Sequence, residues 1–425
     1  MYTETISALL DFIDRSPTCF HVVDNLKKML PNAVPLREEE VWTLEPGKSY
    51  YVTRNHSSLI AFRLPKGKLK GLRLAAAHSD SPVFKVKPRP EMGQEGLYVK
   101  LNVEKYGGML IAPWLDRPLS VAGRLVLRSE GGMTAKLVNV DRDLCLIPHV
   151  AIHLDRTAND GAAMNLQTDL LPLLGAGEDM GAFLPLVAEA AGVRAEDVLD
   201  YDLYVYNRMK GTIWGAEREF FSSRSLDDLE CVWPLMQGYL AAEPSEEYGA
   251  LLGVFDTEEV GSGSRQGAGS TFLSDVTERI FDALGLGLQE RQAALAQTTL
   301  VSADNAHAVH PNHPEKSDPT NRTALNGGIV IKYNAAQRYT TDGYSAAWFK
   351  LVCEAAGVPW QSYVNRSDIA GGSTLGHIAL QRVGVSAVDI GLPQLAMHSP
   401  YETAGVKDPA CLLEAMRVYF SAGGF

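Results

Sequence analysis

Hydrophobic and polar residues recur along the chain with two periods, which predict helices first and strands soon after. Segments 6–14 and 20–30 carry apolar residues every three or four positions, as an amphipathic helix does. Segments 49–54 and 57–64 then indicate strands, and 71–77 (GLRLAAA) is almost entirely apolar. A short strand with few polar positions is typical of a mostly parallel sheet, where both faces are buried. The first eighty residues therefore predict the start of an α/β domain.

A different pattern occupies the region from about 85 to 215. Apolar and polar residues alternate over 96–104, 119–129 and 134–140, and Gly-Gly pairs at 107–108 and 131–132 mark turns. This region is predicted to be β-rich, with one acidic helix-like segment that ends at Ala191. Strand–helix alternation returns after 215. We therefore predict an α/β domain built from 1–84 plus 216–425, interrupted by a β-rich insertion at 85–215.

Net charge, apolar content and cysteine spacing argue against several classes of function. The 425 residues carry a net charge of −12, and the short basic stretch 85–89 is the main positive run, so nucleic acid binding is not expected. No run of 18 apolar residues predicts a membrane helix. The N-terminal segment contains Asp11 and Asp14 and resembles no signal peptide, which favours the cytoplasm. Five scattered cysteines without a CxxC motif indicate free thiols rather than a zinc–thiolate site.

Histidine and carboxylate residues follow the predicted strands of the α/β domain. Ligands bind beyond the carboxyl ends of the strands in such sheets, so these side chains are expected to meet. Mixed histidine and carboxylate ligands suit one or two zinc ions. The residues at or shortly after strand ends are His78, Asp227, Glu258, Glu259, Asp304 and His398.

Each of these residues also has an ordinary structural explanation. A single histidine at a strand end is commonly a hydrogen-bonded loop residue, and Asp227 fits the acidic first turn of a helix. Asp304 fits a turn, and the glutamate pair fits a solvated loop. Repetition at equivalent strand ends favours the metal site. Asp80, two residues after His78, is placed to hold the imidazole ring, although it also fits a turn before Pro82.

Two further motifs are weaker candidates. His307, His310 and His313 recur every three residues, but Pro311 and Pro314 prevent a helix from presenting them as one ligand row. The glycine-rich segment 261–269 matches neither the GxGxxG motif nor the GK[ST] motif of nucleotide-binding loops. The chain also has no GxSxG nucleophile motif. Nucleotide binding and serine hydrolase chemistry are therefore not expected.

At these residues the sequence resembles the aspartyl aminopeptidase family of zinc metallopeptidases. The resemblance runs from about 16 to 404, with the matching segments in the order found in the family. The motifs DTEEVGS, SADNAHAVHPNH and LAMHS are highly specific for the family when they occur together. The matching segments are SPTCFHVV, AHSDSP, YGGML, IPHVAIHLDR, SLDDLE, DTEEVGS, SADNAHAVHPNH, IKYNAAQRY and LAMHSPYE.

The resemblance implies a two-zinc aminopeptidase with a mixed sheet flanked by helices and an inserted, barrel-like dimerisation domain. Asp227 would bridge the two zinc ions. His78 and Asp304 would complete one metal site, while Glu259 and His398 would complete the other. Glu258 would act as general base, and Asp80 would orient His78.

The resemblance also implies an assembly and a substrate class. Family members form dodecamers, so a homo-oligomer is expected, and His153 would reach the active site of a neighbouring subunit. The substrate would be a peptide, with Lys332 contacting an acidic N-terminal side chain. The alternative for Lys332 is a solvated strand lysine, and for His153 a packed strand histidine. Asp228 stands where the family often has asparagine, which adds charge beside the bridging ligand.

Glu258 and Glu259 are adjacent but receive different roles. On an extended backbone their side chains would diverge, so one could hold metal while the other faces the attacking water. Two other functions remain open: a two-metal amidohydrolase or deacylase without peptide specificity, and a non-catalytic scaffold of the same fold.

Overall fold

The computed structural model describes residues 2–161, 163–177 and 180–423, and the chain divides into two compact units. The core unit comprises 1–80, 211–397 and 402–425, and the inserted unit comprises 81–210 and 398–401. The insertion predicted at 85–215 thus differs from the observed contiguous segment by a few residues at each end.

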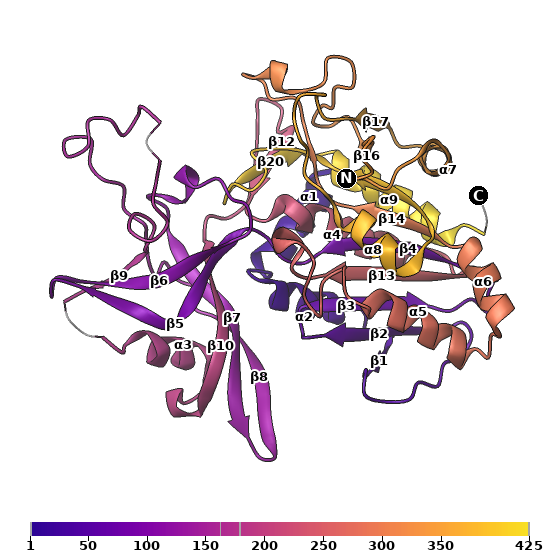
Figure 1. Cartoon of the computed structure of the whole chain (residues 1–425), viewed down its shortest axis with the longest axis horizontal. Helices are drawn as coiled ribbons and strands as arrows, with labels where there is room; N and C mark the ends of the chain where they lie inside the picture. Colours follow the sequence, from indigo (N-terminus) through magenta and orange to yellow (C-terminus); the bar gives the residue numbers. More distant parts are fainter. Residues whose placement is uncertain (1, 162, 178–179, 424–425) are drawn as a thin grey trace. The chain divides into compact units, whose positions relative to one another are not determined.

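The core unit is organised around a nine-stranded mixed sheet (Figure 1). Strand β4 is buried along its whole length, and it lies parallel to both of its neighbours, β13 and β14. Parallel pairing extends on to β18, so four adjacent strands direct their carboxyl ends to one edge. The strand order is β1 (Val34–Leu36), β2 (Ser49–Arg54), β3 (Ser58–Arg63), β13 (Tyr248–Phe255), β4 (Gly71–His78), β14 (Thr299–Ala303), β18 (Ser386–Gly391), β16 (Ile329–Lys332) and β17 (Trp360–Tyr363).

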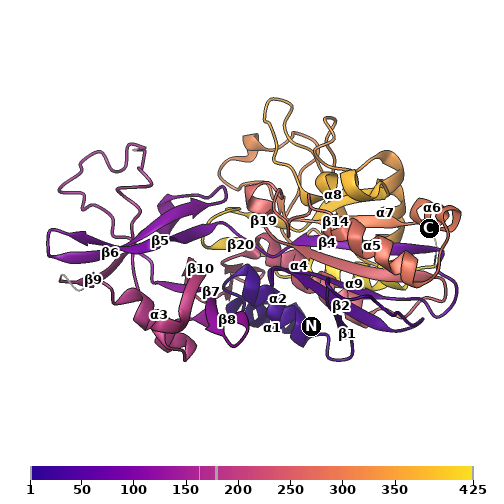
Figure 2. The ribbon, with the colours of Figure 1, turned by 60° about the horizontal axis from the view of Figure 1, so that its bottom comes forward.

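Helices cover both faces of this sheet, and Figure 2 shows α5 and α8 on one side with α4 and α9 on the other. Each layer is closed by its own apolar cluster, which explains why β4 lacks polar alternation. One face carries α1 (Tyr2–Asp14), α2 (Cys19–Lys28), α4 (Leu226–Ala241), α7 (Gly343–Ala356) and α9 (Asp408–Ser421). The other carries α5 (Phe272–Ala283), α6 (Leu288–Ala296) and α8 (Leu375–Val383).

A second, five-stranded sheet in the core unit lies among the segments that follow the main strands. It joins segments distant in the sequence, since β12 runs antiparallel to β20 with Ser223 opposite Glu402. Its strand order is β11 (Thr212–Trp214), β12 (Phe220–Ser223), β20 (Glu402–Gly405), β19 (Pro393–Leu395) and β15 (Ala306–His307).

The inserted unit contains a six-stranded sheet, β-rich as predicted, whose strand order ends at β8 and β9 without forming a closed barrel. Cys145 bridges Leu119 of β7, and Leu146 bridges Leu173 of β9, so residues 145–146 link these two strands. Helix α3 packs on β8, and its Phe183, Val187 and Ala191 enter the unit's apolar cluster. The strand order is β8 (Gly132–Asn139), β7 (Leu119–Ser129), β10 (Val198–Asn207), β5 (Val83–Gln94), β6 (Tyr98–Tyr106) and β9 (Leu173–Ala176), with α3 spanning Phe183–Ala191.

Two expectations from composition can be compared with the fold. All five cysteines are buried free thiols, as predicted. Among the described residues, no helix combines the length and apolar character needed to cross a membrane.

Candidate metal centre

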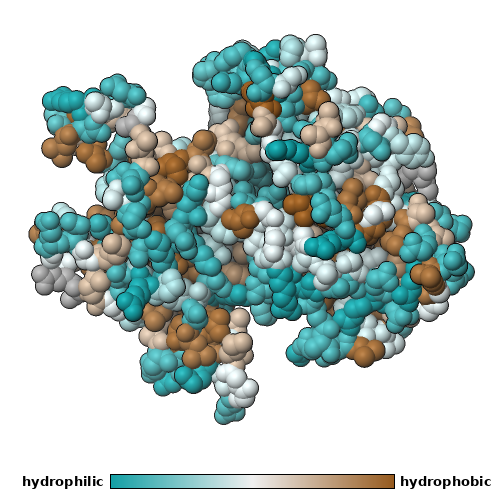
Figure 3. Space-filling model, in the orientation of Figure 1, coloured by the Kyte–Doolittle hydropathy of each residue, from teal (hydrophilic) through white to brown (hydrophobic). Residues whose placement is uncertain are grey.

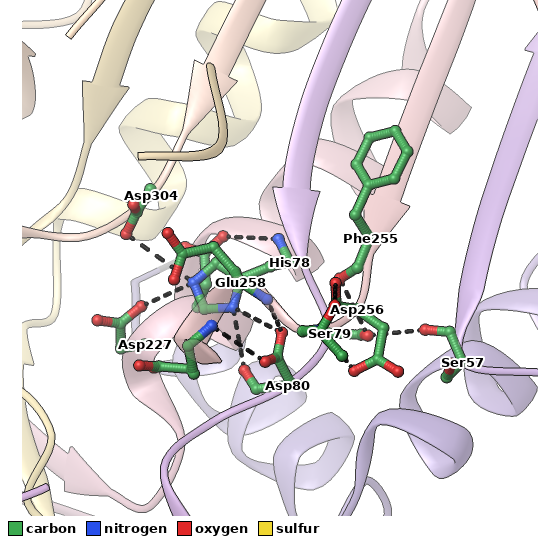
Figure 4. Close-up of polar contacts among 12 residues, drawn as sticks. Ser57, His78, Ser79, Asp80, Asp227, Phe255, Asp256, Glu258 and Asp304 are labelled. Carbon is green, nitrogen blue, oxygen red and sulfur yellow. Dashed lines mark hydrogen bonds and ion pairs between the residues drawn. The ribbon is translucent and has the colours of Figure 1, made fainter. Parts of the chain in front are cut away.

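His78 is the last residue of β4 and lies at the centre of a buried polar cluster (Figure 4). Its Nε2 lies 3.2 Å from an Asp227 oxygen and 3.9 Å from an Asp304 oxygen. On the other side of the ring, Nδ1 lies 3.0 Å from the backbone carbonyl of Asp80. Because that contact occupies Nδ1, the ring presents Nε2 to the carboxylates.

Asp227 and Asp228 stand at the beginning of α4, where the backbone departs from helical geometry. Ser225 just before them is left-handed, with φ of 53°. The Asp227 N–H donates to a Glu402 carboxylate oxygen at 3.1 Å, and the His78 N–H donates to Asp228 at 3.1 Å. The non-helical start thus directs both aspartates toward the end of β4. Asp227 is therefore not simply an acidic residue in the first turn of a regular helix.

Asp304 follows β14, and its backbone is held against β18. Its N–H donates to the Ile390 carbonyl at 3.1 Å, and a Cβ at the next residue, Gly391, would lie 1.9 Å from the Asp304 carbonyl. Only glycine permits this approach. On the far side, the buried Lys332 ammonium lies 3.9 Å from an Asp304 oxygen and donates to the Asn305 carbonyl at 2.8 Å.

Glu258 and Glu259 follow β13 in a short 3₁₀ helix, Glu258–Val260, so the expectation of an extended backbone was wrong. Their backbone N–H groups donate to the two carboxylate oxygens of Asp80, at 3.1 and 3.2 Å. A 3₁₀ helix turns by about a third of a circle per residue, which still separates the two side chains. Asp80 therefore contacts His78 and anchors the turn that carries both glutamates.

The cluster concentrates carboxylates away from water. Burial, reinforced by neighbouring carboxylates, raises the pKa of Glu258 to about 8 and raises the pKa values of Glu259 and Asp228. Burial opposes the charge of His78, but Asp228, Asp227 and Asp80 outweigh it and raise its pKa. Lys332 is also buried, and Asp304 raises its pKa against the effect of burial. Carboxylates held in this way favour a neutralising cation.

The side chains fit divalent metal ions. His78, Asp227, Asp228 and Asp304 each offer a ligand atom, and these atoms lie within 4.8 Å of one another. His78 also forms such a group with Glu258 and Glu259. One buried oxygen of Asp228 has no hydrogen-bond partner among the described residues. The sequence marked Asp228 only as a residue that stands where the family often has asparagine. Its position next to Asp227 in the LDD motif was the signal that it could offer a ligand atom.

Two predicted site residues belong to the inserted unit. His398 lies in its 398–401 segment, in the left-handed region with φ of 67°, and its carbonyl accepts a hydrogen bond from Leu110 N–H at 3.1 Å. His398 directly follows Met397 of the core unit. His153 is exposed in a turn, so the alternative of a packed strand histidine was wrong. Their roles remain predictions.

The weaker candidates also have defined positions. His307, His310 and His313 lie on β15 and the loop after it, without a helix, as the prolines predicted. All three are exposed. Lys332 is 3% exposed, so the alternative of a solvated strand lysine was wrong.

A buried histidine–carboxylate cluster at the carboxyl edge of an α/β sheet, with glutamates beside it, defines the class of metal-dependent hydrolases. Comparison with known proteins agrees. The family model described as aminopeptidase I zinc metalloprotease (M18) matches residues 12–420. The chain belongs to this M18 family, and it is a metallo-aminopeptidase, a hydrolase that acts on peptides.

Relatives match over nearly their whole length. A probable M18 family aminopeptidase 2 from Clostridium novyi is 45% identical, covering 94% of each chain. One from Pseudomonas aeruginosa is 42% identical, covering 99% of each. A chain in the solved Ape4 and Nbr1 complex is 36% identical with a TM-score of 0.94, covering 99% of this chain and 86% of that one. The mApe1 dodecamer of S. cerevisiae is 27% identical with a TM-score of 0.86, covering 97% and 95%.

Proposed function

We propose that the protein removes the N-terminal residue from peptides with two zinc ions and with Glu258 as general base. The observation that carries this proposal is the convergence of His78, Asp227 and Asp304 within ligand distance beside the Glu258–Glu259 turn. Asp227 would serve as a ligand in both metal sites; His78 and Asp304 would complete one site, and Glu259 and His398 would complete the other. The protein is proposed to work in the cytoplasm.

The mechanism assigns proton movements to Glu258. When bound, zinc ions supply Lewis acidity, which lowers the pKa of water toward ~7 and stabilises negative charge on a scissile carbonyl. The Glu258 carboxylate takes the proton of the attacking water and passes it to the leaving amine. Asp80 keeps that carboxylate in place through the backbone N–H groups of Glu258 and Glu259. His153 of a neighbouring subunit donates a hydrogen bond to the developing oxyanion.

The proposed substrate class is peptides with an acidic N-terminal residue. Lys332 supports this preference because its ammonium is buried beside Asp304, where a charge interacts strongly with a substrate carboxylate. A preference for N-terminal Asp or Glu over Asn or Gln would follow.

The proposed assembly is a homo-oligomer, up to a dodecamer built from dimers. The loop that carries His153 exposes apolar side chains, and Figure 3 shows hydrophobic surface on this loop at the upper left of the view. Val150 is 55% exposed and Leu154 is 83% exposed. Contact with another copy would cover such residues. The dodecameric mApe1 neighbour supports the same arrangement.

A subunit-mixing experiment tests the role of His153. Each of two variants, His153→Ala and Glu258→Gln, is expected to be nearly inactive alone. Mixed oligomers should regain activity, because an intact Glu258 of one chain then meets an intact His153 of another. Initial rates after subunit exchange, followed with labelled chains, measure this recovery. His149→Ala, an exposed histidine of the same loop, is the matched control and should keep full activity. Proven exchange without recovery would place His153 in its own chain's site.

A substrate panel with and without chelator tests the proposed function as a whole. Aminoacyl and peptide substrates with a free N-terminus should be cleaved, acidic ones fastest, and chelation should abolish cleavage until zinc is returned. Blocking the N-terminus should prevent cleavage. Hydrolysis of blocked peptides alone would instead favour an amidohydrolase or deacylase. A purified oligomer with near-zero zinc content and no activity after zinc addition would favour the scaffold.

A further inference from the structure

An open pocket of about 440 Å³ in the core unit stands apart from the carboxylate cluster in its charge. Its lining includes His307, His310, His313, Lys316 and Arg366, and none of its lining residues is Asp or Glu. The whole chain carries a net charge of −12, whereas this lining is cationic or neutral; Glu315 and Asp368 adjoin it through contacts with His313 and Arg366 and balance part of its charge. Pockets of this volume enclose ligands larger than one side chain.

The pocket begins close to the proposed metal centre. Tyr363 forms part of its wall and is paired with Lys332 across the neighbouring strands β17 and β16. The Lys332 ammonium lies 3.9 Å from Asp304, while the rings of Tyr363 and His307 are 6.1 Å apart. His307 itself is three residues beyond Asp304 and pairs with Gln394, which also lines the pocket. A peptide extending from the metal centre along this wall would reach the cationic lining.

Lys316 is the lining residue best placed to read a charge. It ends the short helix η4 (Pro314–Lys316), its side chain is exposed, and it forms no ion pair within the part of the chain that the structure describes. Arg366, by contrast, is paired with Asp368 at 2.6 Å and also donates to the Glu315 carbonyl, and His313 contacts Glu315 at 3.2 Å. Lys316 makes no such short contact, although its charge is near enough to Glu315 and Asp368 to help lower their pKa values, so its ammonium is the lining charge that a ligand reaches most directly.

We propose that this pocket binds the part of the substrate after the scissile bond, and that Lys316 recognises a carboxylate on its second or third residue. This inference rests on the proposed aminopeptidase function and adds a second specificity site to it. The carboxylate has two sources, an acidic side chain or the free C-terminus of a short peptide. Lys332 is buried under Asp304 and is proposed for the N-terminal residue, so the two lysines read different positions.

The test uses tripeptides that all begin with alanine, so the N-terminal residue never changes. Glutamate is compared with glutamine at the second and third positions in C-terminally amidated peptides, and Ala-Ala-Ala is compared with its amide. The first comparison measures recognition of an acidic side chain, and the second measures recognition of the free C-terminal carboxylate. We expect the carboxylate to lower KM by about two- to fivefold with little change in kcat, the size of an exposed ion pair. Added salt should reduce this preference.

Variants assign the effect to Lys316. Lys316→Gln should abolish the preference and Lys316→Glu should reverse it, while the neutral peptides keep their kcat. Lys136→Gln, an exposed lysine on β8, makes the same charge change elsewhere and should leave the preference intact. An equal KM for glutamate and glutamine peptides and for acid and amide, or a preference that survives Lys316→Glu in a folded oligomer, would overturn the proposal.

A binding measurement separates this proposal from the proposed function. The same labelled tripeptides are titrated into the zinc-loaded Glu258→Gln protein, and the ratio of Kd values replaces the ratio of KM values. If no peptide is cleaved by the wild type but the Kd ratio still depends on Lys316, the pocket stands and the proposed chemistry fails. If neutral peptides are cleaved and the Kd ratio does not depend on Lys316, the proposed chemistry stands and the pocket proposal fails.

Discussion

Glu258→Gln is expected to lower kcat for peptide hydrolysis by roughly 10²–10⁴-fold, the usual contribution of a positioned general base. Glutamine has the same shape but cannot accept the proton of water. The backbone N–H of residue 258 would still donate to Asp80, so the turn should survive. Steady-state kinetics beside zinc analysis of the same preparation measure both quantities, and the zinc content should remain at the wild-type value.

Glu354→Gln is the matched control, because Glu354 is an exposed glutamate on α7 and its change alters net charge by the same amount. It should leave kcat unchanged. A Glu258→Gln protein that cleaves at a near wild-type rate would refute the assignment of the base. A variant that loses zinc together with activity would instead make Glu258 a ligand.

Asp227→Asn is expected to lose most bound zinc and therefore both activity and metal-dependent stability. A bridging carboxylate contributes to both proposed sites, and an amide is a much weaker ligand. Zinc at 1,000 times its Kd would stabilise the wild-type protein by about 4 kcal/mol, and this gain should be absent from the variant. Metal analysis and Tm measured with and without chelator test the expectation.

Asp160→Asn, an exposed aspartate of the inserted unit, provides the control and should retain zinc and the chelator-dependent change in Tm. If Asp227→Asn keeps two zinc ions per chain, the bridging role is wrong. If it keeps one with high affinity, Asp227 belongs to a single metal site.

Much of the core unit could be predicted from the sequence because its strands are marked by strong local patterns. The apolar run GLRLAAA became the fully buried β4, and LLGVF became the end of β13. Since parallel neighbours end at one edge, residues after separate strands were expected together. His78, Asp227 and Asp304 do lie within ligand distance.

The remaining features depend on contacts between distant parts of the chain. The bonds from Asp80 to the Glu258–Glu259 turn join segments 178 and 179 residues apart, which no local pattern reports. The 3₁₀ helix at Glu258 and the non-helical start of α4 depend on such partners as well. The link between β7 and β9 through residues 145–146 likewise joins distant segments, whereas strand alternation alone reports only that the region is β-rich.

The interrupted core has a consequence for how the protein is made. His78 at the end of β4 and Phe255 at the end of its partner β13 are separated by roughly 180 residues of sequence. At ~5–20 residues per second, a ribosome needs roughly 10–35 s to make that stretch. Throughout this interval the apolar β4 has neither of its sheet neighbours, and the contiguous part of the inserted unit, 81–210, is made within it. The nascent chain is therefore most in need of chaperones while its insertion is being translated.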